Sequence, residues 1–410
     1  MLALSSAAQA GIVIPAGDWT LDIGGNVNAY YTSTRLTGDT TAGYATYWTG
    51  AGRGDSLINA SSDNRTQNNI TTGLLPNYLS VSGKTRQNDL DVAFTISINP
   101  GTSTTQAGIQ TGGSGALAGN QENRQAFMTF GDKSWGEIKL GKDLGIYASD
   151  AILNDMTLLG VGSGAGGLAG NTTTTGRIGT GFMYADWKGQ IAYTTPNWNG
   201  FQATVGVTQA FNAQALGSTS SASVGRGGST PAFEGKVSYS WTGDVSGKIW
   251  ASAIQQKFTD IGTRSDAYGS DTMRSYDAGA SVSMGALNLV AYMYDGEGIG
   301  QTVQGFGGIG HGGKLRDSKG GYVQAKYTLP TNTTLGISWG QSRLETVNSS
   351  DVIATGQAGK DLKDRMWAVG AYHALTKNLN LVAEYSDVKS EVGSLEGKGR
   401  TASLGAILFF

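Results

Sequence analysis

The feature that most constrains the fold is a strand-length pattern of alternating hydrophobicity that recurs along the chain. Side chains on a strand point alternately to opposite faces. In residues 90–98 one face would therefore be wholly apolar, because it would carry Leu90, Val92, Phe94, Ile96 and Ile98. The same alternation returns at 322–329 and at 379–385. Segments of about ten residues with this pattern predict strands that have one apolar face and one polar face.

The connections between these segments alternate in length. Short ones with turn-forming residues lie at 87–89, 131–134, 196–200, 242–244, 284–286, 330–332 and 376–378. Long ones rich in Gly, Ser, Thr and Asn lie at 36–76, 99–120, 142–177, 211–230, 258–272, 296–317, 345–362 and 390–399. Seven short turns and eight long loops connect sixteen strands, with both chain ends on the short-turn side. This arrangement is typical of a closed transmembrane β-barrel.

The C-terminal segment reads TASLGAILFF and agrees with that reading. One face of this strand would hold only apolar side chains, namely Ala402, Leu404, Ala406, Leu408 and Phe410. A soluble protein seldom leaves such an edge strand open, whereas a closed barrel pairs its last strand with its first and turns the apolar face to lipid. We therefore predict an all-β fold, a 16-stranded antiparallel transmembrane β-barrel, in the outer membrane of a Gram-negative bacterium.

Composition excludes a helical membrane protein. The chain has 410 residues, 64 Gly, 6 Pro and no Cys, with a formal net charge of −2. No stretch approaches the roughly 18 consecutive apolar residues that a spanning helix needs. No linker divides the chain, so we predict a single domain over 11–410. On composition alone, a large soluble β-protein remains the alternative.

The first ten residues, MLALSSAAQA, end in Ala8-Gln9-Ala10. Signal peptidase cuts after an A-x-A triplet of this kind. We therefore expect residues 1–10 to be the remnant of a signal peptide and the mature chain to start at Gly11; a flexible tail is the alternative.

The residues that could carry chemistry are few. His311 and His373 are the only two histidines, and there is no Cys, so neither a metal site nor a Cys–His nucleophile has support. The glycines at 160–166 mimic a phosphate-binding loop but lack its strand-to-helix context. We expect no catalytic residue, no cofactor and no enzyme; an outer-membrane hydrolase built on one of the two histidines is the alternative.

The connection at 142–177 differs from the other long ones because it is rich in apolar residues. These are Leu144, Ile146, Tyr147, Ile152, Leu153, Met156, Leu158 and Leu159. So much apolar surface is normally buried, and the lumen of a 16-stranded barrel is wide enough to admit a loop. We predict a constriction loop folded into the lumen; packing outside the barrel on a neighbouring loop or subunit is the alternative.

Two runs carry a resemblance to a known family. The run from Arg124 to Lys142, RQAFMTFGDKSWGEIKLGK, resembles the fourth and fifth strands of general Gram-negative trimeric porins, which lead into the constriction loop. The run from Ile191 to Phe201, IAYTTPNWNGF, and the terminal Phe410 are also similar. The turn at 372–377 resembles porins of betaproteobacterial type.

In that family, acidic residues on the loop face arginines on the opposite wall, and the field between them sorts ions. By this resemblance, Asp155 and Asp150 would be the loop carboxylates. Arg124 and Arg177 would be the wall cations.

Two further positions are predicted to line the constriction although they depart from the family pattern. Tyr78 stands where the second strand of many porins has an arginine, and Lys142 replaces the arginine after the fifth strand. These departures leave the sign of ion selectivity open.

The resemblance implies a homotrimeric channel for passive diffusion of small hydrophilic solutes and ions. Implied partners are outer-membrane lipid, lipopolysaccharide and the barrel-insertion machinery, which would read Leu404, Leu408 and Phe410 as an assembly signal. No nucleic-acid partner is implied. A substrate-specific channel of the same fold is the alternative, and Tyr78 and Tyr147 are the residues that favour it.

Overall fold

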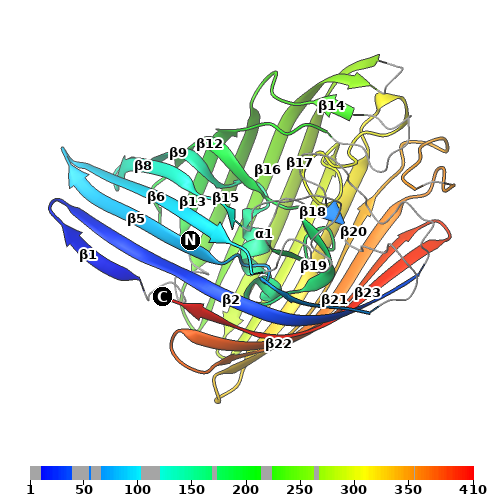
Figure 1. The fold of residues 1–410 in the computed structure, drawn as a ribbon. Helices are drawn as coiled ribbons and strands as arrows, with labels where there is room; N and C mark the ends of the chain where they lie inside the picture. Colours follow the sequence, from blue (N-terminus) through cyan, green and yellow to red (C-terminus); the bar gives the residue numbers. More distant parts are fainter. Residues whose placement is uncertain are drawn as a thin grey trace.

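A computed structural model of the chain describes residues 11–38, 55–56, 66–102, 121–168, 173–213, 224–262, 267–354 and 356–410. These residues form a closed antiparallel β-barrel (Figure 1). The prediction of a 16-stranded all-β barrel is thereby confirmed. The expected signal-peptide remnant at 1–10 lies outside the described residues.

The wall strands follow one another around the barrel in sequence order. They are β2 (Trp19–Gly38), β5 (Tyr78–Gln87), β6 (Leu90–Pro100), β8 (Ala126–Asp132), β9 (Gly136–Leu144), β12 (Trp187–Thr194), β13 (Phe201–Thr208), β15 (Ala232–Trp241), β16 (Val245–Gly262), β17 (Ala267–Met284), β18 (Leu287–Glu297), β19 (Asp317–Thr328), β20 (Thr333–Leu344), β21 (Leu362–Ala374), β22 (Leu379–Val392) and β23 (Leu395–Phe409).

Shorter elements complete the chain. Paired with single wall strands are β1 (Ile12–Ala16), β4 (Thr66–Thr71), β7 (Gln121–Glu122) and β14 (Val224–Arg226). A separate small sheet holds β3 (Asp55–Ser56), β10 (Ser163–Leu168) and β11 (Thr174–Gly176). The helical elements are α1 (Ser149–Asn154), η1 (Met156–Leu159) and η2 (His311–Gly313). None of the helices in the described ranges is both long and apolar enough to span a membrane.

The barrel closes where its last strand meets its first. β23 pairs with β2 from Asn26 to Gly38. At the C-terminus the amide of Gly25 donates to the carbonyl oxygen of Phe410 at 2.8 Å, and the amide of Phe410 donates to the carbonyl of Gly25 at 3.0 Å. Since β22 pairs with the other edge of β23, the terminal strand has a partner on both sides, as a strand in lipid requires.

All seven predicted short turns separate consecutive wall strands. Two predicted long loops are wrong in extent. At 258–272 most residues belong to β16 and β17, and at 390–399 the strands β22 and β23 leave only Gly393 and Ser394 between them. These strand ends carry polar residues on both faces, so their composition resembles that of a loop although their backbone continues the ladder.

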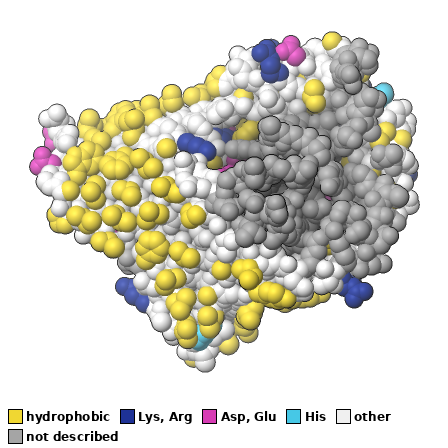
Figure 2. Space-filling view, viewed as in Figure 1, with side chains coloured by type: hydrophobic (Ala, Val, Ile, Leu, Met, Phe, Trp, Pro, Cys, Tyr) yellow, Lys and Arg dark blue, Asp and Glu magenta, His cyan; other side chains and the backbone are white. Residues whose placement is uncertain are grey.

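The two faces of the wall differ as the alternation predicts. On β18, Met293 points outward and is 63% exposed, whereas its neighbours Tyr292 and Tyr294 point inward and are buried. Figure 2 shows apolar side chains gathered over the outer face around β2, β5 and β6, where Val27 and Ile96 are exposed. The outer face is therefore an apolar surface, and much of the inner face is covered by folded-in segments.

The close approach of strands at the closure gives a testable prediction. A Cβ at Gly25 would overlap the carbonyl oxygen of Tyr78 and touch the ring of Phe410. Gly25→Ala should therefore destabilise the folded barrel by about 1–3 kcal/mol. Gly235→Ala is the matched control, because its Cβ would meet no atom closer than 3.8 Å. The shift of the folded band to the unfolded position in SDS gels, measured against temperature, should occur earlier for Gly25→Ala alone.

Candidate pore constriction

The chain enters the barrel directly after β9, and the described residues 145–168 and 173–186 run inside it before β12 begins (Figure 1). Figure 1 shows α1 within the barrel. The apolar side chains of this segment pack inside the wall: Tyr147, Ile152 and Met156 are all buried. We call the described residues 145–168 and 173–186 the inner loop. Its apolar residues thus have the buried surroundings that their number predicted.

Two buried carboxylates on the wall hold the inner loop at separate points. Glu234 of β15 accepts hydrogen bonds from the backbone amides of Ile146 and Tyr147, each at 2.8 Å. Glu384 of β22 accepts from the amides of Val161 and Gly162, at 2.7 and 2.8 Å. A carboxylate that receives backbone N–H donors makes charge-assisted hydrogen bonds, which are stronger than neutral ones.

Neutral side chains hold the middle of the inner loop. The side chain of Gln324 on β19 accepts from the amide of Met156 at 2.6 Å and donates to the carbonyl of Asn154 at 3.0 Å. The hydroxyl of Tyr322 donates to the carbonyl of Ala151 at 2.8 Å. The inner loop therefore runs along the wall rather than hanging free in the lumen.

Asp150 attaches α1 to the wall through ion pairs. Its carboxylate contacts the ammonium groups of Lys236 on β15, at 2.9 Å, and of Lys248 on β16. Asp150 is buried, whereas the two lysine side chains keep 22% and 28% of their surface exposed. Burial raises the pKa of Asp150, but the two ammonium groups outweigh it and hold the pKa below the ordinary 3.8.

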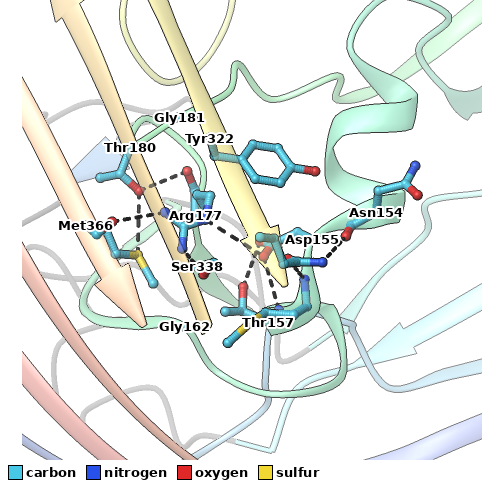
Figure 3. A network of polar contacts seen from close by, with 12 residues as sticks. Asn154, Asp155, Thr157, Gly162, Arg177, Thr180, Gly181, Tyr322, Ser338 and Met366 are labelled. Atoms are coloured by element: carbon cyan, nitrogen blue, oxygen red, sulfur yellow. Dashed lines mark hydrogen bonds and ion pairs between the residues drawn. The ribbon is translucent and has the colours of Figure 1, made fainter. Parts of the chain in front are cut away.

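Asp155 and Arg177 lie next to each other instead of facing across the pore (Figure 3). The Nε of Arg177 is 3.9 Å from Oδ1 of Asp155, and neither side chain has any exposed surface. The guanidinium also donates to the carbonyl of Met366 at 3.1 Å and to the hydroxyl of Ser338. This arrangement differs from the expected pair of opposed lumen charges, because both side chains are buried between the inner loop and the wall.

Asp155 has a local role in the inner loop as well. It is the N-terminal cap of η1, where its carboxylate accepts hydrogen bonds from the amide and the hydroxyl of Thr157 at 3.0 and 2.7 Å. Such a cap satisfies a backbone donor that the helix leaves unpaired. Burial raises the pKa of Asp155, against the opposing effect of Arg177.

The other predicted site residues lie apart from α1. Arg124 precedes β8, where it pairs with Glu122 at 3.0 Å and lies over the ring of Trp187. Tyr78 begins β5 opposite Asn26 and is half-buried. Lys142 donates to the carbonyl of Asn123 at 2.7 Å.

The side chain of Lys142 points to the outer face of the barrel. Its neighbour Asp143 lies opposite Lys188 in the ladder, and Lys188 faces inward, where it contacts Glu234. Because side chains alternate along a strand, Lys142 points away from the lumen, unlike a constriction residue.

Sequence reasoning missed the cations that actually contact the inner loop, Lys236 and Lys248. A signal existed, because each alternates with outward apolar residues such as Val237 and Ile249. Polar residues on the inner face of predicted strands were therefore available as candidates. The same pattern marks Glu384, which the alternation at 379–385 places on the polar face.

The two histidines and the acidic side chains are the possible metal ligands among the described residues. Among them, no group of three or more His, Cys, Asp or Glu could hold a metal ion. The Nδ1 of His373 is hydrogen-bonded to the hydroxyl of Thr333 at 2.9 Å, and His311 is exposed on η2.

Comparisons with known proteins agree with this architecture. A family model described as Gram-negative porin matches residues 1–393. A search of curated proteins finds no match. Among solved structures, the outer membrane channel DcaP of Acinetobacter baumannii is similar with a TM-score of 0.66 and 13% identity, over 97% of this chain and 99% of that one.

Two further structures are similar over nearly their whole length. The anion-selective porin from Comamonas acidovorans has a TM-score of 0.59 and 13% identity, over 96% of this chain and 100% of that one. OmpF of Salmonella typhi, solved with daunomycin, has a TM-score of 0.57 and 15% identity, over 97% and 100%. The chain therefore belongs to the Gram-negative porin family, as an outer-membrane β-barrel channel for passive diffusion of solutes and not an enzyme.

Proposed function

We propose that the channel passes small hydrophilic solutes and ions and that the inner loop sets its narrowest part. The observation that carries this proposal is the attachment of the loop inside the barrel, from Glu234 on β15 to Glu384 on β22. A segment held at successive points along the wall occupies lumen cross-section permanently, so it limits the size of the solutes that pass.

We propose that Lys236 and Lys248 give this constriction a preference for anions. Two partly exposed ammonium groups face the buried carboxylate of Asp150, so the charge beside α1 that is in contact with solution is positive. The neighbouring Asp277 is buried and hydrogen-bonded to Ser252 and Tyr292. Asp155 and Arg177 add little, since they are buried and lie together. In a pore with low-dielectric walls, a local excess of one sign raises the concentration of the opposite ion.

The same fold could instead serve one substrate. The half-buried Tyr78 is the observation that favours such a channel; Tyr147 is fully buried inside the inner loop and offers no surface to a solute. A substrate-specific channel would show conductance that saturates with one solute and is blocked by it.

We also propose a homotrimer in contact with outer-membrane lipid and lipopolysaccharide, which the family resemblance supports. The exposed Leu404 and Leu408 fit a lipid-facing or subunit-facing strand. Because the strand that ends at Phe410 is already paired on both edges, the insertion machinery would read it before the barrel closes. Chemical cross-linking of the channel in mild detergent should give a trimer band, and a monomer band alone would contradict the proposal.

Charge substitutions test the proposed selectivity. Asp150→Asn should shift the reversal potential in a salt gradient toward anions, because it leaves both lysines uncompensated. The double variant Lys236→Gln/Lys248→Gln should shift it toward cations. Asp155→Asn is the matched control and should move it little, since that carboxylate is buried away from the solution. Equal shifts for Asp150→Asn and Asp155→Asn in planar bilayers would contradict the assignment.

The lowered pKa of Asp150 predicts a pH dependence with a definite sign. A carboxyl with a folded-state pKa below its ordinary 3.8 keeps its ion pairs above that pH and loses them as the pH falls through the lowered value. The rise in anion preference that comes from Asp150 should therefore appear only below about pH 4. The Asp150→Asn channel should lack this acid step in reversal-potential measurements.

Substitution of Glu384 tests whether attachment to the wall positions the inner loop. Glu384→Ala leaves the buried amides of Val161 and Gly162 without their acceptor, at a cost of about 1–3 kcal/mol for each. Open-channel current noise and protease cleavage within the loop should both increase. Glu384→Gln keeps a carbonyl acceptor and should be intermediate, and Glu137→Ala, an exposed residue on β9, should behave as the parent channel.

A further inference from the structure

A second connection is folded into the barrel, between β18 and β19. Its Gly-rich sequence, GFGGIGHGG at 305–313, was expected to be part of a polar loop. In the structure, every residue from 299 to 310 is buried, including the polar Gln301, Thr302 and Gln304. We call residues 298–316 the second loop.

The second loop rests on the inner loop. The amide of Tyr184 donates to the carbonyl of Thr302 at 2.9 Å. The side-chain amide of Gln304 donates to the carbonyls of Tyr184 and Ala185, at 3.1 and 3.3 Å. The two loops are therefore hydrogen-bonded to each other inside the barrel.

The second loop also reaches wall strands on both sides of its own position. On one side, Lys188 of β12 donates to the side chain of Gln304 at 2.8 Å. On the other side, the side chain of Gln301 contacts Asp364 of β21. In the wall, β12 is separated from β18 by β13, β15, β16 and β17, and β21 from β19 by β20. The second loop thus crosses the lumen as a chord from β12 to β21.

The space below this chord is filled by an apolar core. Phe306 and Ile309 of the second loop belong to the same buried cluster as Trp250 of β16 and Tyr292 and Tyr294 of β18. A close-packed interior of this kind leaves no room for solutes. At this level solutes are therefore restricted to the other side of the chord, next to β5, β6, β8 and β9. The inner face of β2 is covered by the inner loop, because the hydroxyl of its buried Tyr30 donates to the carbonyl of Leu159 at 2.7 Å.

The shape of the second loop is fixed by its backbone and by an ion pair. Gly298, Gly300, Gly305 and Gly307 have φ values of 76°, 87°, 83° and 69°, which glycine adopts at little cost. Arg316 donates from Nε and Nη2 to the two carboxylate oxygens of Asp351, at 2.7 and 2.6 Å.

This ion pair connects the second loop to the segment between β20 and β21, which contains Asp351. Both side chains are almost wholly buried. Asp351 also accepts from the amides of His311 and Val347, at 3.0 and 3.1 Å. A bidentate Arg–carboxylate pair fixes geometry as well as adding energy, so it acts as a clasp at the end of the second loop.

We propose that the second loop is a second size-determining element of the channel, held across the lumen by the Arg316–Asp351 clasp. It restricts the extracellular half of the pore to the part beside β5, β6, β8 and β9, whereas the inner loop limits the passage beside α1. The size restriction by the second loop would hold whether or not Lys236 and Lys248 give the channel a preference for anions.

Opening the clasp tests the proposal. Arg316→Ala should raise single-channel conductance and extend liposome swelling to larger sugars, because the second loop loses the attachment at its end next to β19. The conservative variant Arg316→Lys keeps a cationic donor beside Asp351 and should stay closer to the parent than Arg316→Ala does. Arg343→Ala is the matched control, since its pair with Asp361 is formed by partly exposed side chains at the base of the same connection. Unchanged conductance and size cut-off in Arg316→Ala would overturn the proposal.

A labelling experiment keeps the proposal testable if Arg316→Ala fails to fold. The chain has no Cys, so one introduced thiol can be followed in the complete channel. Thr302→Cys replaces a side chain that is 1% exposed and should resist a water-soluble maleimide. Lys314→Cys, at an exposed position, should react. Rapid labelling of Thr302→Cys in the folded channel would show that the second loop does not occupy the lumen and would overturn the proposal.

Discussion

The hydrogen-bonded ladder between β2 and β23 is the interaction on which the rest of the structure depends. It turns a long antiparallel sheet into a barrel, so that the backbone groups of both terminal strands are paired. The bonds between Gly25 and Phe410 extend this ladder to the last residue. Once the sheet is closed it has an inside, and only then can the segments after β9 and β18 find walls on several sides to pack against.

Closure also changes what a polar side chain on the inner face does. In an open water-filled lumen, residues such as Glu234, Gln324 and Glu384 would be solvated. Here they accept hydrogen bonds from backbone amides of the inner loop. These bonds satisfy backbone donors of a non-helical, buried segment, which would otherwise destabilise the fold. The polar inner face thus serves as a binding surface for the chain's own loops.

The sequence contained enough to predict the wall. Alternation with period 2 and the turn residues predicted the seven short turns, and the apolar residues at 144–159 predicted a buried loop. The sequence did not predict which side chains contact each other inside the barrel. Alternation distinguishes inward-facing from outward-facing side chains, but it does not distinguish those that line the lumen from those that contact a folded-in loop. Asp155 and Arg177 are both charged and both inward, yet their pairing depends on the three-dimensional path of the inner loop. The second loop was missed for another reason: its glycines adopt positive φ in a fixed shape, and the same glycines are also typical of a mobile connection.

The packing of the two loops bears on selectivity as well as on size. Many inward-facing charged side chains take part in structural contacts. Glu384 accepts from backbone amides, Arg177 is hydrogen-bonded to β20 and β21, and Arg316 is paired with Asp351. A buried and compensated charge contributes little field to the solution in the pore. The proposed preference for anions therefore rests on charges that the loops leave partly exposed, such as Lys236 and Lys248, which pair with Asp150 of α1. On this proposal the loops act on selectivity indirectly, because their packing leaves some wall charges in contact with water and buries others.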